Sequence, residues 1–233
     1  MKTIAIITAR GGSKRIPRKN IKEFCGKPIL AYSIEAAIAS GVFDEVMVST
    51  DDDEIADIAK RYGAKVPFMR SEATANDYAT TVDVLKEVLE RYREMGQQFT
   101  KACCIYPTAP FVTGEKLRDA MKTLEEQDTF SVIPVVPFSF PPQRGLVIAQ
   151  GNLTYVQPEH KNTRSQDLEH IYHDCGQFYC FDVEVLFRQG SLFGEGTKPL
   201  IMNPLEVQDI DNEEDWQIAE MKYRLMESRA NRE

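Results

Sequence analysis

Ile4-Ala5-Ile6-Ile7, followed by Thr8-Ala9-Arg10-Gly11-Gly12, is the stretch that decides the fold. Four consecutive apolar residues closed by two glycines are typical of a central parallel strand that is buried on both faces. Ligands of open α/β sheets bind outside the carboxyl ends of such strands, and glycines there let the backbone approach a ligand closely. The stretch therefore predicts the first strand of an α/β sheet with a binding site directly after it.

Outward from this strand, apolar stripes at helical spacing alternate with short apolar runs. The stripes predict helices at about 30–40, 55–62, 82–92, 114–126 and 216–226. The runs predict strands at 45–49, 66–68, 102–106, 131–135, 177–181 and 200–202. Strands that alternate with helices indicate an α/β fold with a doubly wound, mostly parallel sheet. At 233 residues the chain is predicted to form a single domain, 1–233.

The pattern changes at about 138–175, which we interpret as an inserted arm. Pro134, Pro137, Pro141 and Pro142 fall close together, and two apolar runs flank Gly151-Asn152. A Gly-Asn pair between two such runs is typical of a β-hairpin.

The chain is acidic, because its 28 basic residues face 36 acidic ones and the net charge is −8. A surface of that sign repels a nucleic-acid backbone, so no nucleic-acid partner is expected. The apolar run after Met1 is too short for a secretory signal, and no membrane span is expected. Five cysteines without a CxxC pair favour a reducing, cytoplasmic location.

The loop after the first strand is basic, although the chain as a whole is acidic. Six basic side chains fall between residues 10 and 22: Arg10, Lys14, Arg15, Arg18, Lys19 and Lys22. Arginine and lysine at the end of a strand are suited to hold phosphates, although a solvated basic loop is the alternative. The loop has neither the glycine-lysine pair of a Walker A motif nor the spacing of GxGxxG.

This loop, Ala9 to Asn20, resembles the signature loop of the sugar-acid cytidylyltransferases, the family that includes the CMP-sialic acid synthetases. Further segments resemble that family in the same order: Gly26-Lys27-Pro28, Ser49-Thr50-Asp51-Asp52, Tyr106-Pro107-Thr108-Ala109-Pro110 and Gln208-Asp209-Ile210-Asp211. Arg15 and the run from His173 to Tyr179 are similar to the branch that acts on pseudaminic acid. The resemblance implies a Rossmann-like nucleotide-diphospho-sugar transferase fold and a homodimer formed through the arm.

The resemblance also implies roles for individual residues. Catalytic contacts to the CTP phosphates would come from Arg10, Lys14 and Lys19. The other nucleotide-binding residues would be Gly11, Gly12, Ser13, Asn20, Arg70, Thr80 and Thr81, with the last three near cytosine. The acceptor pocket would include Tyr106, Arg164, Gln177 and Tyr179. Without the resemblance, the threonine pair is more typical of a helix cap.

Two groups of aspartates are candidates for metal or ligand contacts. Asp209 and Asp211 stand two apart, so on an extended segment both carboxylates face one side and could share Mg²⁺. Taken alone they are more typical of helix caps, and the resemblance reverses that preference. Asp51, Asp52 and Asp53 are expected first to cap the helix that follows and second to face a ligand.

The predicted reaction is the transfer of CMP from CTP to a nine-carbon sugar acid, with release of pyrophosphate and no assigned general base. Pseudaminic acid is the expected acceptor, and N-acetylneuraminic and legionaminic acid are the alternatives. A different class of function, a nucleotide-binding protein without turnover, would be favoured if several of Lys14, Lys19, Asp209 and Asp211 were missing. All four are present.

Overall fold

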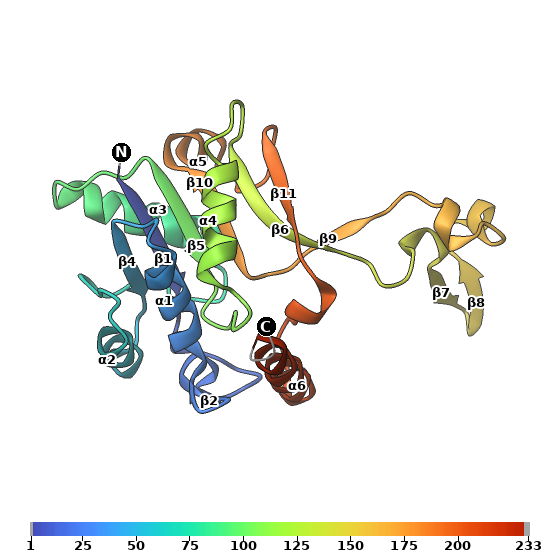
Figure 1. Cartoon of the computed structure of the whole chain (residues 1–233), viewed down its shortest axis with the longest axis horizontal. Helices are drawn as coiled ribbons and strands as arrows, with labels where there is room; N and C mark the ends of the chain where they lie inside the picture. The colour runs from blue at the N-terminus through green and yellow to red at the C-terminus, as the bar shows by residue number, and fades with distance from the viewer. Residues whose placement is uncertain (1, 231–233) are drawn as a thin grey trace.

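The computed structural model describes residues 2–230, and within them the chain forms a seven-stranded sheet of order β11-β6-β10-β5-β1-β4, with β9 beside β6 (Figure 1). The strands of this sheet are β1 Thr3–Thr8, β4 Glu45–Ser49, β5 Lys101–Ile105, β6 Ser131–Pro137, β9 Tyr172–Asp174, β10 Phe178–Asp182 and β11 Thr197–Ile201. β10 runs antiparallel to β5 and β6, and β9 runs antiparallel to β6. The other three pairs are parallel, so all strands except β9 and β10 run in one direction and the sheet is mixed but mostly parallel.

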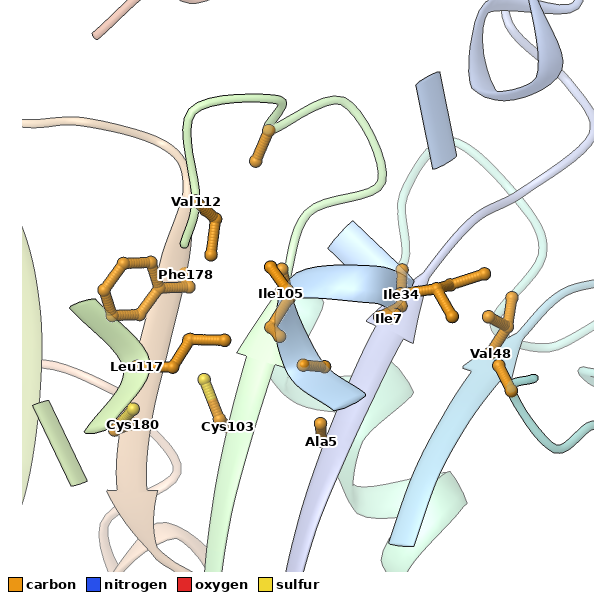
Figure 2. Packing of buried hydrophobic residues seen from close by; sticks show 14 of the residues in the cluster. Ala5, Ile7, Ile34, Val48, Cys103, Ile105, Val112, Leu117, Phe178 and Cys180 are labelled. Carbon is orange, nitrogen blue, oxygen red and sulfur yellow. The ribbon is translucent and has the colours of Figure 1, made fainter. Parts of the chain in front are cut away.

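Helices cover both faces of the sheet, as a doubly wound fold requires. They are α1 Ile29–Ser40, α2 Asp53–Arg61, α3 Thr81–Glu94, α4 Gly114–Thr123, α5 Val183–Gln189 and α6 Glu213–Ala230. Ala5 and Ile7 of β1 pack with α1, α2 and α4 (Figure 2), whereas Ile4 and Ile6 pack with α3 and α5. All four side chains are fully buried. The prediction that the first strand is buried on both faces is therefore confirmed.

A separate apolar cluster holds α6 against the loop that follows β1. Phe24, in the small hairpin of β2 Glu23–Phe24 and β3 Lys27–Pro28, packs edge-on against Trp216 and Tyr223 of α6 at centroid distances of 5.5 and 5.6 Å. The same cluster includes Ile16 from the basic loop and Ile210 from the segment before α6. Burial of these two side chains in one cluster brings the basic loop and the Asp209–Asp211 segment together.

The strand predicted at 66–68 does not form. The backbone of Lys65 alone bridges to β4, where it donates to Val46 and accepts from Val48 at 2.9 Å each. The pairing ends there because Pro67, two residues later, has no N–H to donate to a ladder.

Several predicted boundaries also differ from the structure; the strand predicted at 200–202, for example, is β11 Thr197–Ile201. The helix predicted at 114–126 ends at Thr123. The hairpin turn is one residue earlier than expected, because Ala149 of β7 Leu146–Ala149 pairs with Asn152 of β8 Asn152–Tyr155. Gln150 and Gly151 are then the two turn residues, with φ angles of 50° and 80°, as a type I′ turn requires.

The predicted arm projects from the sheet between β6 and β9 and carries the β7–β8 hairpin (Figure 1). It is shorter than the predicted 138–175, because residues 172–174 form β9 and pair with β6. Within residues 2–230, none of the helices has both the length and the apolar character to cross a membrane.

Candidate active site

The basic loop leaves the carboxyl end of β1 and is pinned by backbone and amide hydrogen bonds. The Gly11 N–H donates to Asp51 Oδ1 at 2.8 Å. Asn20, which is buried, donates from Nδ2 to the Arg10 carbonyl at 2.8 Å and closes the loop on itself. These bonds give the loop, called the phosphate loop below (residues 9–22), a defined path.

Arg18 ties the phosphate loop to the start of α2. Its backbone has a left-handed φ of 56°, which is uncommon for a residue with a side chain. Its guanidinium binds both carboxylate oxygens of Asp52, a geometry that suits arginine. Asp52 also caps α2 by accepting the Ile55 N–H at 3.0 Å, so its expected capping role is confirmed. The hydrogen bond from Arg18 lowers the pKa of Asp52, which keeps the pair ionised.

The two glycines of the loop differ in the space around them, which gives a matched test. A Cβ on Gly11 would lie 2.8 Å from Asp52 Oδ2 and 3.0 Å from Asp52 Cβ, whereas one on Gly12 would meet nothing within 4 Å. Because Arg18 and α2 hold Asp52 in place, Gly11→Ala should lower the free energy of unfolding by about 1–3 kcal/mol. Gly12→Ala should stay within about 0.5 kcal/mol of the wild type. Urea denaturation measures the free energy of unfolding of both variants. Equal stability of the two variants would contradict the conclusion that Arg18 and α2 hold Asp52 in place.

A cleft of about 510 Å³ opens beside this loop. Of the predicted site residues, it is lined by Arg10, Ser13, Lys14, Lys19, Asn20, Arg70, Thr80, Thr81 and Tyr106. The cleft thus collects side chains from the phosphate loop, the segment before α3 and the end of β5. It is the arrangement expected at the carboxyl ends of the strands of an α/β sheet.

Arg70 is a buried cation at one wall of the cleft, with only 9% of its surface exposed. Its Nε donates to Ser49 Oγ at 3.1 Å and its Nη2 to the Ser49 carbonyl at 2.7 Å. Burial lowers the pKa of Arg70, and the nearby carboxylate of Asp51 opposes that effect. A charge kept in this position at such a desolvation cost is suited to bind a polar ligand.

The two threonines before α3 have different surroundings. Thr80 forms a capping box with Asp83, so the interpretation of this residue as a helix cap is confirmed. The hydroxyl of Thr81 instead lies 3.2 Å from the Tyr106 hydroxyl. Thr81 therefore faces the end of β5, whereas the side chain of Thr80 caps α3.

Tyr106 lines the cleft, whereas Tyr179 and Gln177, two of the other predicted acceptor residues, do not. Tyr179 packs edge-on against Tyr106 with ring centroids 5.5 Å apart and donates to Asp174 Oδ2 at 2.7 Å. Gln177 is 1% exposed and donates from Nε2 to the Glu206 carbonyl at 2.7 Å. Its Oε1 has no hydrogen-bond partner among the described residues. Burial raises the pKa of Tyr106, which keeps its hydroxyl protonated.

Arg164 does not lie with these residues. It belongs to the arm, which Figure 1 shows projecting from the sheet. Its Nε pairs with Asp167 Oδ2 at 2.7 Å. The side chain is exposed and does not line the cleft of its own chain.

Lys19 connects the phosphate loop to the Asp209–Asp211 segment. Its Nζ donates to the Ile210 carbonyl at 2.8 Å, and burial lowers its pKa although Asp211 and Asp209 both act to raise it. Asp209 and Asp211 lie in a segment without regular secondary structure and flank the buried Ile210. Both carboxylates act on the charge of Lys19, and their sharing of one face stays a prediction.

The donor set of this segment fits Mg²⁺, which prefers carboxylate oxygens. Within the described part of the chain, no three His, Cys, Asp or Glu side chains come together in a way that could hold a metal. A Mg²⁺ ion held by Asp209 and Asp211 would take its remaining ligands from phosphate and water, as is common for this ion.

Asp77 is the cleft residue that sequence reasoning missed. It comes from the segment before α3, and its carboxylate contacts Arg10 at 2.6 Å and Lys14 at 2.5 Å. Asp211 contacts Arg15 at 2.7 Å in the same way. No sequence pattern signals the Asp77 contacts, because its partners are more than 60 residues away.

Comparison with known proteins gives one matching family model, two similar relatives and one similar solved structure. A family model described as cytidylyltransferase matches residues 4–202. The chain is 38% identical over 226 residues to a pseudaminic acid cytidylyltransferase of Campylobacter jejuni, covering 97% of each chain. It is 37% identical to a CMP-N,N'-diacetyllegionaminic acid synthase of Legionella pneumophila, again covering 97% of each. Among solved structures, a CMP:2-keto-3-deoxy-manno-octonic acid synthetase complexed with CTP is similar with a TM-score of 0.70 and 17% identity, covering 98% of this chain and all of that one.

Proposed function

This chain belongs to the cytidylyltransferase family, and from that membership we propose that it transfers CMP from CTP to a nine-carbon sugar acid, with pseudaminic acid as the acceptor. The full-length similarity to a pseudaminic acid cytidylyltransferase carries the proposal. The cation-lined cleft at the end of β1 supports it, because Arg10, Lys14 and Lys19 are suited to bind a triphosphate.

In this reaction the anomeric hydroxyl of the sugar acid attacks the α-phosphorus of CTP. A new P–O bond forms, the bond to the β-phosphate oxygen breaks, and pyrophosphate leaves. Arg10, Lys14 and Lys19 would hold the phosphates and stabilise the charge that develops on the leaving group. Arg70 and Thr81 would bind cytosine, since their donors match its O2 and N3 acceptors. Fixed orientation of the two reactants supplies a further share of the rate enhancement.

Asp209 and Asp211 would hold Mg²⁺ at the triphosphate end of the cleft. When bound there, the ion neutralises negative charge on the phosphates. Lys19 of the phosphate loop binds the Ile210 carbonyl between these two aspartates, so its cation would lie beside the proposed metal.

Legionaminic acid is a second candidate acceptor. The observation in its favour is that the legionaminic acid synthase relative is 37% identical to this chain, almost as similar as the pseudaminic acid relative. N-acetylneuraminic acid is a weaker candidate.

The decisive experiment is pyrophosphate release from the purified protein with Mg²⁺, each of the four nucleoside triphosphates and each sugar acid in turn. The panel contains pseudaminic, legionaminic, N-acetylneuraminic and ketodeoxyoctonic acid. Release that requires both CTP and pseudaminic acid is expected. Release with a different acid would keep the reaction and change the acceptor, and no release with any pair would favour a nucleotide-binding protein without turnover.

A homodimer formed through the arm is part of the same proposal. Ile148 and Leu153 stand opposite each other in the β7–β8 hairpin and are 78% and 70% exposed. An apolar pair this exposed favours burial against a second copy. We expect a dimer in light scattering after gel filtration, and a shift toward monomer when both residues are replaced by serine. Phe193→Ser, which changes a 73% exposed residue outside the arm, should remain a dimer.

We also propose that the enzyme works in the cytoplasm. All five cysteines are free thiols in the structure, which suits a reducing compartment. Localisation of a fluorescent fusion would test this, and an exported fusion would contradict it.

A further inference from the structure

The carboxylate of Asp77 holds two of the three proposed phosphate-binding cations. Arg10 Nη1 lies 2.6 Å from one of its oxygens and Lys14 Nζ lies 2.5 Å from the other. Within residues 2–230, these are the only side-chain partners of either cation. The hydrogen bonds from Lys14 and Arg10 hold the pKa of Asp77 below its usual value, so the carboxylate stays charged near neutral pH.

The position of Asp77 is set by its own segment. The Oδ1 atom of Asn76 accepts the N–H groups of Tyr78 at 2.8 Å and Ala79 at 3.0 Å, and its Nδ2 donates to the Ala73 carbonyl at 2.8 Å. The turn around Asn76 therefore has a defined shape, and both Asn76 and Asp77 line the cleft. Asp77 is thus directed at the phosphate loop from the opposite wall.

A carboxylate that offers one oxygen to an arginine and the other to a lysine makes the contacts that two non-bridging phosphate oxygens would make. We propose that Asp77 competes with the polyphosphate of the nucleotide for Arg10 and Lys14, and so sets the affinity of the cleft for phosphate chains. This inference rests on the proposed function, because it takes the cleft to be the triphosphate site.

Competition of this kind selects by charge. A triphosphate or pyrophosphate carries several negative charges and displaces one carboxylate from the two cations. A nucleoside monophosphate carries fewer charges and gains less from the exchange. Asp77 therefore weakens the binding of every ligand that must displace it, and a monophosphate that does not displace it is affected less.

The test compares Asp77→Asn with Asp57→Asn, which removes the same charge from an exposed position on α2. Isothermal titration calorimetry at one ionic strength measures the Kd for inorganic pyrophosphate, CTP and CMP. Asp77→Asn should bind pyrophosphate and CTP about three- to tenfold more tightly than the wild type, the range expected from two exposed ion pairs. The gain for CMP should be smaller, because a monophosphate displaces Asp77 less readily, and Asp57→Asn should bind like the wild type. A thermal melt checks that each variant is folded.

Unchanged or weaker pyrophosphate binding by the folded Asp77→Asn protein would overturn the inference, since Asp77 would then position the cations or do nothing for them. Absence of pyrophosphate binding by both proteins would overturn it as well. Pyrophosphate tests the cations alone, so the outcomes separate the two proposals. If Asp77→Asn binds pyrophosphate more tightly but the enzyme shows no preference for CTP over the other nucleoside triphosphates, only the proposed function is refuted. If the enzyme turns over CTP but Asp77→Asn leaves the pyrophosphate affinity unchanged, only this inference is refuted.

Discussion

Asp211→Ala is expected to lower Mg²⁺-dependent pyrophosphate release by about 10²- to 10³-fold, because the substitution removes one of two carboxylates proposed to hold Mg²⁺. Asp211 is partly exposed and its backbone lies at the start of α6, so the fold should persist. The measurement is kcat as a function of Mg²⁺ concentration, with a thermal melt to verify folding. The apparent affinity for Mg²⁺ should fall together with kcat.

Asp119→Ala is the matched control for this prediction, because Asp119 is an exposed aspartate on α4 with no ion pair among the described residues. It should retain wild-type turnover and wild-type dependence on Mg²⁺. Asp211 also pairs with Arg15, so Arg15→Ala separates the two roles. If Arg15→Ala reproduces the whole loss with unchanged Mg²⁺ affinity, or if Asp211→Ala is fully active, the metal assignment is wrong.

Lys19→Met should lower kcat/KM for CTP by about 10²- to 10³-fold, the range seen when one preorganised group that stabilises transition-state charge is removed. Methionine keeps the length and apolar stem of lysine but loses the charge and the bond to the Ile210 carbonyl. Steady-state kinetics with varied CTP measures the effect. A loss smaller than about tenfold would show that Lys19 only anchors the loop.

The pH dependence gives Lys19 a second signature. Burial lowers the pKa of Lys19, and the group is charged below that pKa and neutral above it. Since kcat/KM reports on the free enzyme, it should fall as the pH rises through this lowered value. Arginine stays charged throughout the range, so Lys19→Arg should retain part of the activity and shift the alkaline decline to higher pH. An unshifted decline would mean that another group titrates there.

Much of this fold follows from local sequence patterns. The run at residues 4–7 predicts a strand buried on both faces because no polar residue interrupts it, and β1 is such a strand. Most helix boundaries follow from apolar stripes and from glycines such as Gly41, which takes a left-handed φ of 67° at the end of α1. The errors concern local chemistry that a stripe does not show, such as the missing N–H of Pro67.

The site is harder to predict than the fold. The phosphate loop can be predicted from the sequence because its basic residues are close together in an acidic chain. The contacts that shape the loop cannot be predicted in this way, because Arg18 binds Asp52 and Lys14 binds Asp77 across 34 and 63 residues of sequence. Such pairs exist only once the strands and α3 are assembled. The family resemblance assigns Tyr179 and Gln177 to the acceptor pocket, but it cannot show that Tyr179 packs against Tyr106 and that neither residue lines the cleft.

The arm leaves and re-enters the sheet through one ladder, in which Pro137 pairs with Tyr172 and Val136 with His173. The arm between Pro137 and Tyr172 is therefore a long connection between two neighbouring antiparallel strands, and the sheet fixes both of its ends. Lengthening such a connection has a small entropic cost, and changing its sequence disturbs no strand of the core. Mutation and selection can thus rebuild the arm, and with it the proposed contact between two copies of the chain, while the sheet and the cleft beside β1 stay unchanged.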